Sequence, residues 1–262
     1  MYPKILDLGT ITIHTYGLLL AAAFIAGIWI AARNGKKAGI DADTTWNLGL
    51  IVLFSALVGS KISLLLTDFS YYSENPRQFF SLSTFHLNES YYGGLILALA
   101  TAVIFIRKRN IPPLILADLA APGIAFGQAI AGIGCFLAGC CYGRPTDLPW
   151  GIAFSDPYSS QSQGTPLHVP LHPTQLYEAA GVFLIFLLLM HRLSRKFQSG
   201  QIVLEYLGLF ALLRFAVEFF RGDDRHFVLY GLMSASQLIA LLTFIGTAAL
   251  YFLLRCRPVK AQ

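Results

Sequence analysis

Charged side chains stand in and directly after a long apolar segment near the carboxyl end of the chain. Arg214, Glu218 and Arg221 follow one another at spacings of four and three residues, around the end of the stretch 201–220. At these spacings the three side chains share one face of a helix. An ionised group at the centre of a membrane helix costs roughly 2.5–3.5 kcal/mol. Such groups therefore indicate a function, and two arginines indicate the binding of an anion.

A second set of polar residues lies at the ends of other apolar segments. Gln175, Tyr177 and Glu178 begin one of these segments, directly after His172. Lys61 lies about one to two helical turns from the end of another. We expect these side chains to gather with the arginines at one depth, in the outer half of a bilayer.

The formal charges of this polar set do not cancel. Lys61, Arg214 and Arg221 oppose Glu178 and Glu218, which leaves one positive charge for an anionic ligand. At that depth the natural anion is a phospholipid phosphate, which cationic side chains bind through charge-assisted hydrogen bonds. The alternative is structural: Arg214 and Glu218 form a local ion pair, and Lys61 extends its ammonium group toward the headgroups.

Glycine is concentrated close to these polar residues. Gly93-Gly94 begins an apolar segment directly after Tyr91-Tyr92. Small residues let helices pack closely, and glycine also lets the backbone approach a ligand. Both interpretations apply to these two glycines and to the glycines of the fourth apolar segment and the turn after it. That second group consists of Gly123, Gly127, Gly132, Gly134, Gly139 and Gly143.

The composition identifies the elements that must position these residues. The 262 residues are 55 % apolar and 13 % charged, with a mean hydropathy of +0.60, whereas a soluble domain carries roughly 25 % charged residues. A soluble fold is therefore excluded, and apolar stretches of about 20 residues predict membrane-crossing helices. We predict an all-α polytopic membrane protein, a bundle of seven transmembrane helices forming one integral-membrane domain over 1–262. The predicted spans are 14–33, 44–66, 91–106, 114–136, 174–191, 201–220 and 231–254.

The lysines and arginines predict the orientation of these spans. Of the 19 cations, twelve flank alternate ends of the spans, and short cytoplasmic loops collect such residues. The amino terminus is then outside and the carboxyl terminus cytoplasmic, with long external loops at 67–90 and 137–172. The first span is not a cleavable signal peptide, because its positive cluster follows the apolar run. The twelve cations are Arg33, Lys36, Lys37, Arg107, Lys108, Arg109, Arg192, Arg195, Lys196, Arg255, Arg257 and Lys260.

Two further acidic residues lie toward the cytoplasmic ends of their segments. We interpret Asp118 and Glu205 as interfacial. A transporter would need polar groups along a path through the membrane, and the chain shows no pair of inverted repeats with interrupted helices. Transport is therefore the weaker function class.

Four cysteines complete the reactive side chains. Cys135, Cys140 and Cys141 lie near the outer face and Cys256 lies inside, so a disulfide could involve only the first three. A zinc site is disfavoured because the spacing lacks a C-x-x-C pair and no histidine lies nearby in the sequence. We expect small packing residues, and with no metal or nucleotide motif we expect no cofactor.

Several blocks of residues together resemble the prolipoprotein diacylglyceryl transferase family, in a variant with Tyr-Gly-Gly and Gly-Cys-Phe signatures. The resemblance runs in order over nearly the whole chain, and the blocks at 172–178 and 214–223 are specific. The blocks are Tyr16-Gly17, Tyr92-Gly93-Gly94-Leu95, GCFLAGCCYG at 134–143, HPTQLYE at 172–178, RFAVEFFRGD at 214–223, and Gln237.

The resemblance implies an enzyme of the bacterial inner (cytoplasmic) membrane with its active site on the periplasmic side. Its substrates are phosphatidylglycerol and the signal peptides of prolipoproteins, it lies in the lipid bilayer, and it has no nucleic-acid partner. It moves the diacylglyceryl group onto a cysteine thiol, forms a thioether and releases glycerol phosphate. Arg214 is the first choice for stabilising the phosphate leaving group. The expected substrate-binding residues are Tyr16, Lys61, Gly93, Gly94, Gly134, Cys135, Gly143, Gln175, Tyr177, Glu218 and Arg221.

Five positions depart from the family's usual pattern. Tyr92 stands in place of a histidine that is proposed as the base, and Gly132 in place of an arginine. Cys135 replaces an asparagine, Cys140 an acidic residue, and Lys61 another arginine. These departures keep open a different class of function, a non-catalytic homologue that binds phospholipid or lipoprotein signal peptides.

The catalytic base has several candidates. A tyrosine with a pKa near 10 is a poor base at neutral pH, so the hydroxyl of Tyr92 is better suited to donate a hydrogen bond to a phosphate oxygen. The base is then Glu178 or His172, or a cationic environment lowers the pKa of the substrate thiol directly. The expected catalytic residues are thus Arg214, Tyr92, Glu178 and His172.

Overall fold

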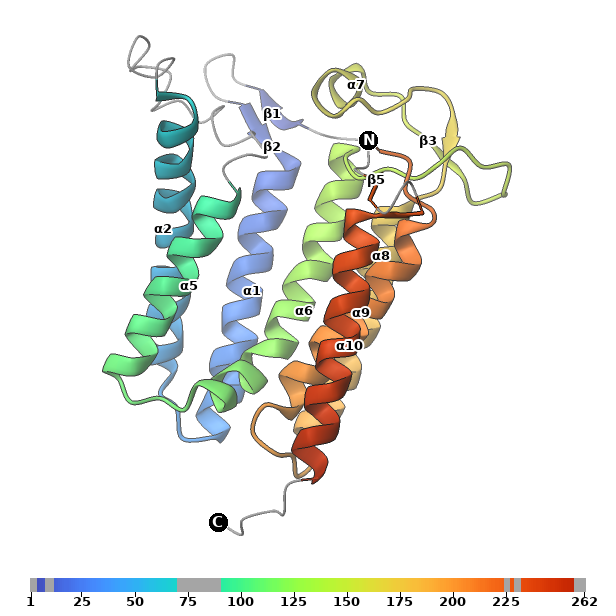
Figure 1. Ribbon diagram of the computed structural model, residues 1–262. Helices are drawn as coiled ribbons and strands as arrows, with labels where there is room; N and C mark the ends of the chain where they lie inside the picture. Colours follow the sequence, from blue (N-terminus) through green and yellow to red (C-terminus); the bar gives the residue numbers. More distant parts are fainter. Residues whose placement is uncertain (1–3, 8–11, 70–90, 224–226, 229–231, 257–262) are drawn as a thin grey trace. The chain divides into compact units, whose positions relative to one another are not determined.

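The computed structural model describes residues 4–7, 12–69, 91–223, 227–228 and 232–256 (Figure 1). Each of the seven predicted segments coincides with a long helix. The seven helices of at least 18 residues in this part of the chain are α1 (Thr15–Lys37), α2 (Ala42–Thr67), α5 (Tyr91–Lys108), α6 (Pro113–Ala138), α8 (Thr174–Leu193), α9 (Gln201–Glu218) and α10 (Ala235–Cys256).

Five of these helices, α1, α2, α6, α8 and α10, are long and apolar enough to cross a membrane. Together with the helical content, they confirm a polytopic helical membrane protein. The chain also forms a seven-residue helix and three short antiparallel strand pairs, β1–β2, β3–β4 and β5–β6. These elements are α7 (Pro157–Gln163), β1 (Lys4–Asp7), β2 (Thr12–His14), β3 (Ile152–Ala153), β4 (Pro170–Leu171), β5 (Phe227–Val228) and β6 (Met233–Ser234).

The helices form two compact units. The first contains Met1–Asn34 with Ala117–Gln262, and the second contains Gly35–Leu116. Most of the predicted external loop 67–90 lies outside the described residues. The loop 137–172 belongs to the first unit and holds β3, α7 and β4.

In the second unit, α2 packs along α5, and glycines form the close contact between the two helices. A Cβ on Gly93 would collide with Ser63 and lie 2.6 Å from the carbonyl oxygen of Gly59. A Cβ on Gly94 would lie 2.8 Å from the carbonyl oxygen of Ala56. The glycine pair therefore allows the two backbones to meet, as small residues do between membrane helices. Its contact with a ligand stays a prediction.

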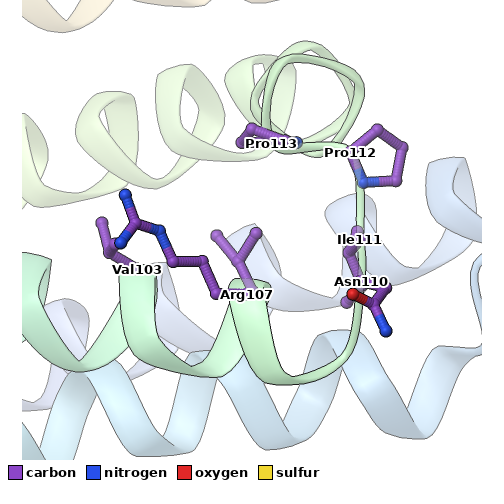
Figure 2. Close-up of a pocket in the computed structure, with 7 residues that line it drawn as sticks. Val103, Arg107, Asn110, Ile111, Pro112 and Pro113 are labelled. Carbon is purple, nitrogen blue, oxygen red and sulfur yellow. The ribbon is translucent and has the colours of Figure 1, made fainter.

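A cavity of about 580 Å³ lies at the other end of α5, in the same unit. Figure 2 shows the residues that line it. The cavity contains none of the predicted site residues. Arg107 and Asn110 are its polar lining residues, and the other residues are apolar: Val103, Ile106, Ile111, Pro112 and Pro113.

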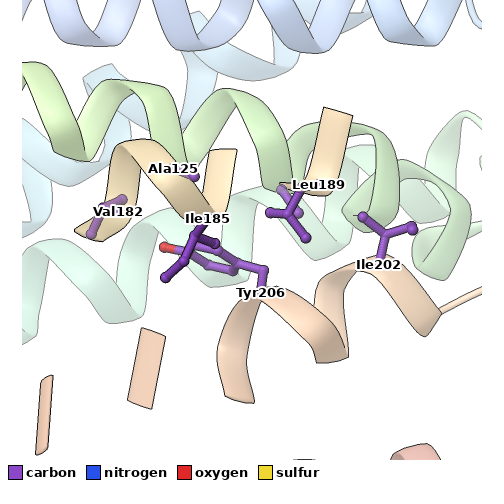
Figure 3. Close-up of a cluster of buried hydrophobic side chains, with 7 residues drawn as sticks. Ala125, Val182, Ile185, Leu189, Ile202 and Tyr206 are labelled. Atoms are coloured by element: carbon purple, nitrogen blue, oxygen red, sulfur yellow. The ribbon is translucent and has the colours of Figure 1, made fainter. Parts of the chain in front are cut away.

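In the first unit, α9 packs against both α8 and α10 (Figure 1). The side chains of a buried apolar cluster come from α6, α8 and α9 (Figure 3). They fix the spacing of the helices that carry the predicted site. The members of the cluster are Ala121, Ala125, Val182, Ile185, Leu189, Ile202 and Tyr206.

One end of this helix group is closed by a polar network that we call the Arg192 cluster: Arg192, Gln201, Glu205 and Tyr251. Arg192 binds Glu205 at 2.9 Å, and Gln201 and Tyr251 each donate to the same Glu205 oxygen at 3.1 Å. Asp118, whose interfacial position stays a prediction, lies near the start of α6. It is fully buried, and its carboxylate accepts hydrogen bonds from the backbone N–H groups of Gly200 and Val203 at the start of α9, where a helix needs acceptors.

Candidate functional site

Arg214 lies on α9 between two carboxylates at the opposite end of the α8–α9 pair. Its Nη1 donates to Glu178 Oε2 at 3.1 Å, and its Nη2 lies 3.2 Å from Glu218 Oε2. The i, i+4 pair with Glu218 follows the predicted helical face, and Glu178 joins it from α8. The Arg214 side chain is 21 % exposed, so the guanidinium is shared by two helices without being sealed from its surroundings.

Glu218 is held more firmly than Glu178. Its side chain is only 2 % exposed, against 26 % for Glu178. The Ser234 hydroxyl donates to Glu218 Oε1 at 2.7 Å. Ser234 in turn exchanges two hydrogen bonds with Gln237 at the start of α10. Glu218 is thereby fixed by a second helix, whereas Glu178 has room to move.

Arg221 binds a carboxylate that we did not predict as a site residue. Its Nε and Nη2 donate to the two oxygens of Asp223 at 3.0 and 2.7 Å, and its Nη1 lies 4.0 Å from Glu178. Among the described residues of this unit, two arginines therefore meet three carboxylates. The predicted positive excess also counts Lys61, which belongs to the second unit, and it stays a prediction. We call Glu178, Arg214, Glu218, Arg221 and Asp223 the Arg214 cluster.

Backbone pairing places Arg221 beside two loop segments. The N–H of Gly143 donates to the carbonyl of His172 at 3.1 Å, and the N–H of Gly222 donates to the carbonyl of Tyr142 at 3.1 Å. The side chain of Arg144 donates to the carbonyl of Arg221 at 3.1 Å. A Cβ on Gly143 would collide with His172, so this glycine is needed for the approach of backbone to backbone.

His172 and Tyr177 are brought together at the start of α8. The Tyr177 hydroxyl lies 3.1 Å from His172 Nδ1 and accepts a hydrogen bond from Trp150 Nε1 at 2.9 Å. Both rings also contact Phe220, which follows α9. His172 is therefore oriented by a chain of polar and aromatic contacts, as a proton-accepting imidazole would need to be.

The three cysteines lie together where α6 ends. Their sulfur atoms are all within 4.8 Å of one another. Hydrogen bonds from the Cys135 and Cys140 thiols, together with the positive charge of Arg221, lower the pKa of the Cys141 thiol. The cysteine group thus adjoins the Arg214 cluster through Arg221. The packing role that we expected for these residues stays a prediction.

The remaining predicted residues fall into two groups. In the first unit, the ring of Tyr16 lies against α6 at Gly134, where an added Cβ would be 3.4 Å from Tyr16 Cδ2. In the second unit, Lys61 and Tyr92 lie on α2 and α5. The side chain of Tyr92 lies outside the described residues, and the roles of both residues stay predictions.

Sequence reasoning missed several residues that complete the site. Asp223 and Trp150 lie outside the predicted apolar spans, where polar residues are ordinary. Ser234 lies at the start of the predicted span 231–254, where a single small hydroxyl side chain gives no signal. The spacing of Arg221 and Asp223, two residues apart at the end of α9, is the one signal that could have indicated a bidentate pair.

Gly132 lies at a close contact between α6 and α8. A Cβ at this position would be 2.9 Å from the Cβ of Ala179 and 3.3 Å from the carbonyl oxygen of Gln175. A larger residue would push the two helices apart. The arginine that the resemblance implies at this position therefore does not fit here without a helix shift.

Known proteins match the chain over almost its whole length. A protein from Clostridium tetani is 31 % identical over 245 residues, which cover 94 % of both chains. A protein from Finegoldia magna is 33 % identical over 253 residues, 96 % of this chain and 95 % of the relative. A protein from Clostridioides difficile is 33 % identical over 237 residues, 90 % of this chain and 88 % of the relative. All three are named phosphatidylglycerol--prolipoprotein diacylglyceryl transferase.

The family comparison agrees with these relatives. The sequence model described as prolipoprotein diacylglyceryl transferase matches residues 3–253, which include every residue of the Arg214 cluster and all three clustered cysteines. The chain therefore belongs to the prolipoprotein diacylglyceryl transferase family.

Proposed function

We propose that this protein transfers the diacylglyceryl group of phosphatidylglycerol to the cysteine thiol in the signal peptide of a prolipoprotein. The thiol sulfur attacks the glycerol carbon that bears the phosphate, a C–S bond forms, the C–O bond breaks, and glycerol phosphate leaves. The observation that carries this proposal is the family match over residues 3–253. The Arg214 cluster supports it, because a partly exposed guanidinium at the end of a membrane helix suits a lipid phosphate.

We further propose that all seven long helices cross the bacterial inner (cytoplasmic) membrane, with the amino terminus outside and the carboxyl terminus in the cytoplasm. Basic residues in the last turns of α1, α5, α8 and α10 support this orientation. The Arg214 cluster then lies on the periplasmic side. Cysteine labelling from either side of sealed vesicles would test it.

Glu178 is the carboxylate that we expect to move when lipid binds. Glu218 is buried and held by Ser234, whereas Glu178 is one-quarter exposed and has one contact with each arginine. A phosphate that replaced Glu178 at Arg214 would gain a charge-assisted contact. The released carboxylate would be available to accept the proton of the substrate thiol. His172, oriented by Tyr177, is the other candidate for this proton transfer.

The other residues that we predicted to bind substrate support the site from its surroundings. Gln175 and Gly143 hold the backbone around the cysteine turn, and Tyr16 packs at Gly134. Lys61, Gly93 and Gly94 are proposed as further substrate-binding residues, and Tyr92 as a catalytic residue. Tyr92 would donate a hydrogen bond to a phosphate oxygen.

A transfer assay tests the proposed reaction. The purified protein in detergent is mixed with phosphatidylglycerol and a peptide that carries the lipoprotein cysteine motif, and the product is identified by mass spectrometry. We expect a diacylglyceryl thioether, and growth of a strain depleted of its own transferase when this chain is supplied. If a relative gives the product under the same conditions and this chain does not, the second candidate is favoured: a homologue that binds phospholipid or signal peptides without transfer. The observation that favours this second candidate is the tight packing at Gly132, where the resemblance implies an arginine.

A further inference from the structure

The fold brings three cysteines together, Cys135, Cys140 and Cys141. Their spacing in the sequence does not match a zinc-binding motif. Their sulfur atoms lie within 4.8 Å of one another. Around an ion with metal–sulfur bonds of about 2.3 Å, tetrahedral geometry places the sulfur atoms roughly 3.8 Å apart. The observed separations exceed that spacing by at most about 1 Å.

The turn after α6 is built to hold this arrangement. Gly139 and Cys141 both adopt positive φ angles, 82° and 60°, a conformation that L residues other than glycine rarely take. The turn is anchored from α8, because Thr174 donates to the carbonyl of Cys141 and Gln175 donates to the carbonyl of Cys140, both at 2.7 Å. The backbone at Cys140 and Cys141 is therefore specified by these contacts from α8.

A buried polar atom beside the cysteines has nothing to bind in the part of the chain that the structure describes. Gln175 is 2 % exposed, and its Oε1 finds no hydrogen-bond partner there, although its Nε2 contacts Cys140. Buried acceptors in native proteins are almost always satisfied. The unsatisfied oxygen indicates that something further, such as a metal-bound water, belongs at this place.

Charge also favours an anionic group here. Arg221 pairs through its backbone with Gly143, two residues after Cys141, which places a positively charged residue beside the cysteine turn. Three thiolates around a divalent ion carry a net charge of −1, and a neighbouring arginine offsets that charge. Thiolate ligands select thiophilic ions such as Zn²⁺ and Cu⁺ over hard cations.

We propose that Cys135, Cys140 and Cys141 form a binding site for a thiophilic d¹⁰ metal ion, with three protein ligands and one open position. The three thiols each lose a proton when the ion binds. The ion would tie the end of α6 to the turn that carries Gly143. A disulfide is the competing outcome, but it would join only two of the sulfur atoms and would not account for the third sulfur atom beside them.

Metal titration of the purified full-length chain tests the site. The protein is reduced, freed of metal with a chelator, and titrated in detergent with Zn²⁺, with Cu⁺ in a parallel arm. We expect one ion per chain, and we expect the thiols that react with a chromogenic reagent to fall from four to one, since Cys256 is exposed at the end of α10. Co²⁺ in place of Zn²⁺ should give sulfur-to-metal charge-transfer absorbance.

Single serine variants assign the ligands. Cys135→Ser, Cys140→Ser and Cys141→Ser should each weaken Zn²⁺ binding at least tenfold and remove most of the Co²⁺ charge-transfer band. The matched control is Cys256→Ser, which should keep one ion per chain and leave no reactive thiol in the Zn²⁺-loaded protein. Metal protection of the unaltered chain keeps the test valid where a variant does not fold.

Three results would overturn the metal site. The first is a reduced, monodisperse chain that binds no Zn²⁺ or Cu⁺. The second is binding that survives all three serine substitutions. The third is a chain isolated without reductant whose mass is 2 Da low because a disulfide joins two of the three cysteines. The transfer assay, run on the same preparation, reports on the proposed reaction separately, so either proposal can fail alone.

Discussion

The two ends of the α8–α9 pair carry polar clusters that differ in how each arginine is used. In the Arg192 cluster one arginine gives three hydrogen bonds to a single carboxylate, Glu205, which also accepts from Gln201 and Tyr251. In the Arg214 cluster the guanidinium is divided between Glu178 and Glu218, with one contact to each. The first arrangement is complete, and the second leaves a contact that a ligand can replace. We therefore infer that the Arg192 cluster stabilises the fold and that the Arg214 cluster takes part in the proposed reaction.

Replacing Arg214 in one variant and Arg192 in another should give the largest difference between the two clusters. Arg214→Ala should lower the transfer rate about 10²–10³-fold, because it removes the donor to the leaving phosphate. Arg192→Ala should lower the melting temperature in detergent and leave the activity of the folded protein close to that of the parent. Transfer rates are measured per folded molecule, with the folded amount taken from gel filtration. Equal losses of activity in both variants would break the comparison.

Replacing one carboxylate in each cluster, Glu178 or Glu205, should change activity and stability in the same contrasting way, but by less than the arginine replacements. Glu178→Gln should slow transfer about tenfold, within the range given by removal of a general base or its partner, and change the melting temperature little. Glu205→Gln should do the reverse, since it leaves Arg192 without its charge partner. The activity and melting temperature of both variants are measured side by side. If Glu178→Gln is fully active, Glu178 is not the base and His172 becomes the stronger candidate.

Replacing Asp118 tests only the end of the α8–α9 pair that carries the Arg192 cluster. Asp118→Ala should reduce stability by about 2 kcal/mol, because two N–H groups at the start of α9, one buried and one partly buried, lose their acceptor. Asp118→Asn keeps one carbonyl acceptor and should cost roughly half as much. Thermal unfolding in detergent gives both values. Transfer activity should stay unchanged below the melting transition, and a selective loss of activity would contradict the separation of the two ends.

The sequence predicted the helices well and the partners of the polar residues less well. Apolar runs such as 44–66 and 114–136 locate α2 and α6 within a few residues, because a membrane sets both the length and the composition of a span. The i, i+4 pair of Arg214 and Glu218 was also predictable, because it is local. Hydropathy does not tell which neighbour a residue faces. The burial of Asp118 and the pairing of Arg221 with Asp223 were therefore missed.

The cysteine group shows the same limit. The spacing of Cys135, Cys140 and Cys141 does not match a zinc motif, so the sequence favoured a packing role. Their approach depends on positive φ angles at Gly139 and Cys141, and a single sequence gives no direct signal for the second of these. Glycine at 139 was visible, but its turn became meaningful only with the positions of the three sulfur atoms.

The smallest expected effect concerns how α8 is set against α6, since this contact positions Glu178. Gly132→Ala places a Cβ 2.9 Å from that of Ala179 and should cost about 1–2 kcal/mol through overpacking. Gly246→Ala in α10 is the matched control, because nothing lies within 4 Å of its added Cβ and alanine favours a helix over glycine by up to about 1 kcal/mol. Melting temperatures should therefore move in opposite directions. A shift of α8 would also carry Glu178 away from Arg214, so transfer should slow a few-fold in Gly132→Ala and not in Gly246→Ala. If Gly132→Ala is as stable as the parent, α6 and α8 have room to separate, and an arginine at this position becomes compatible with the fold.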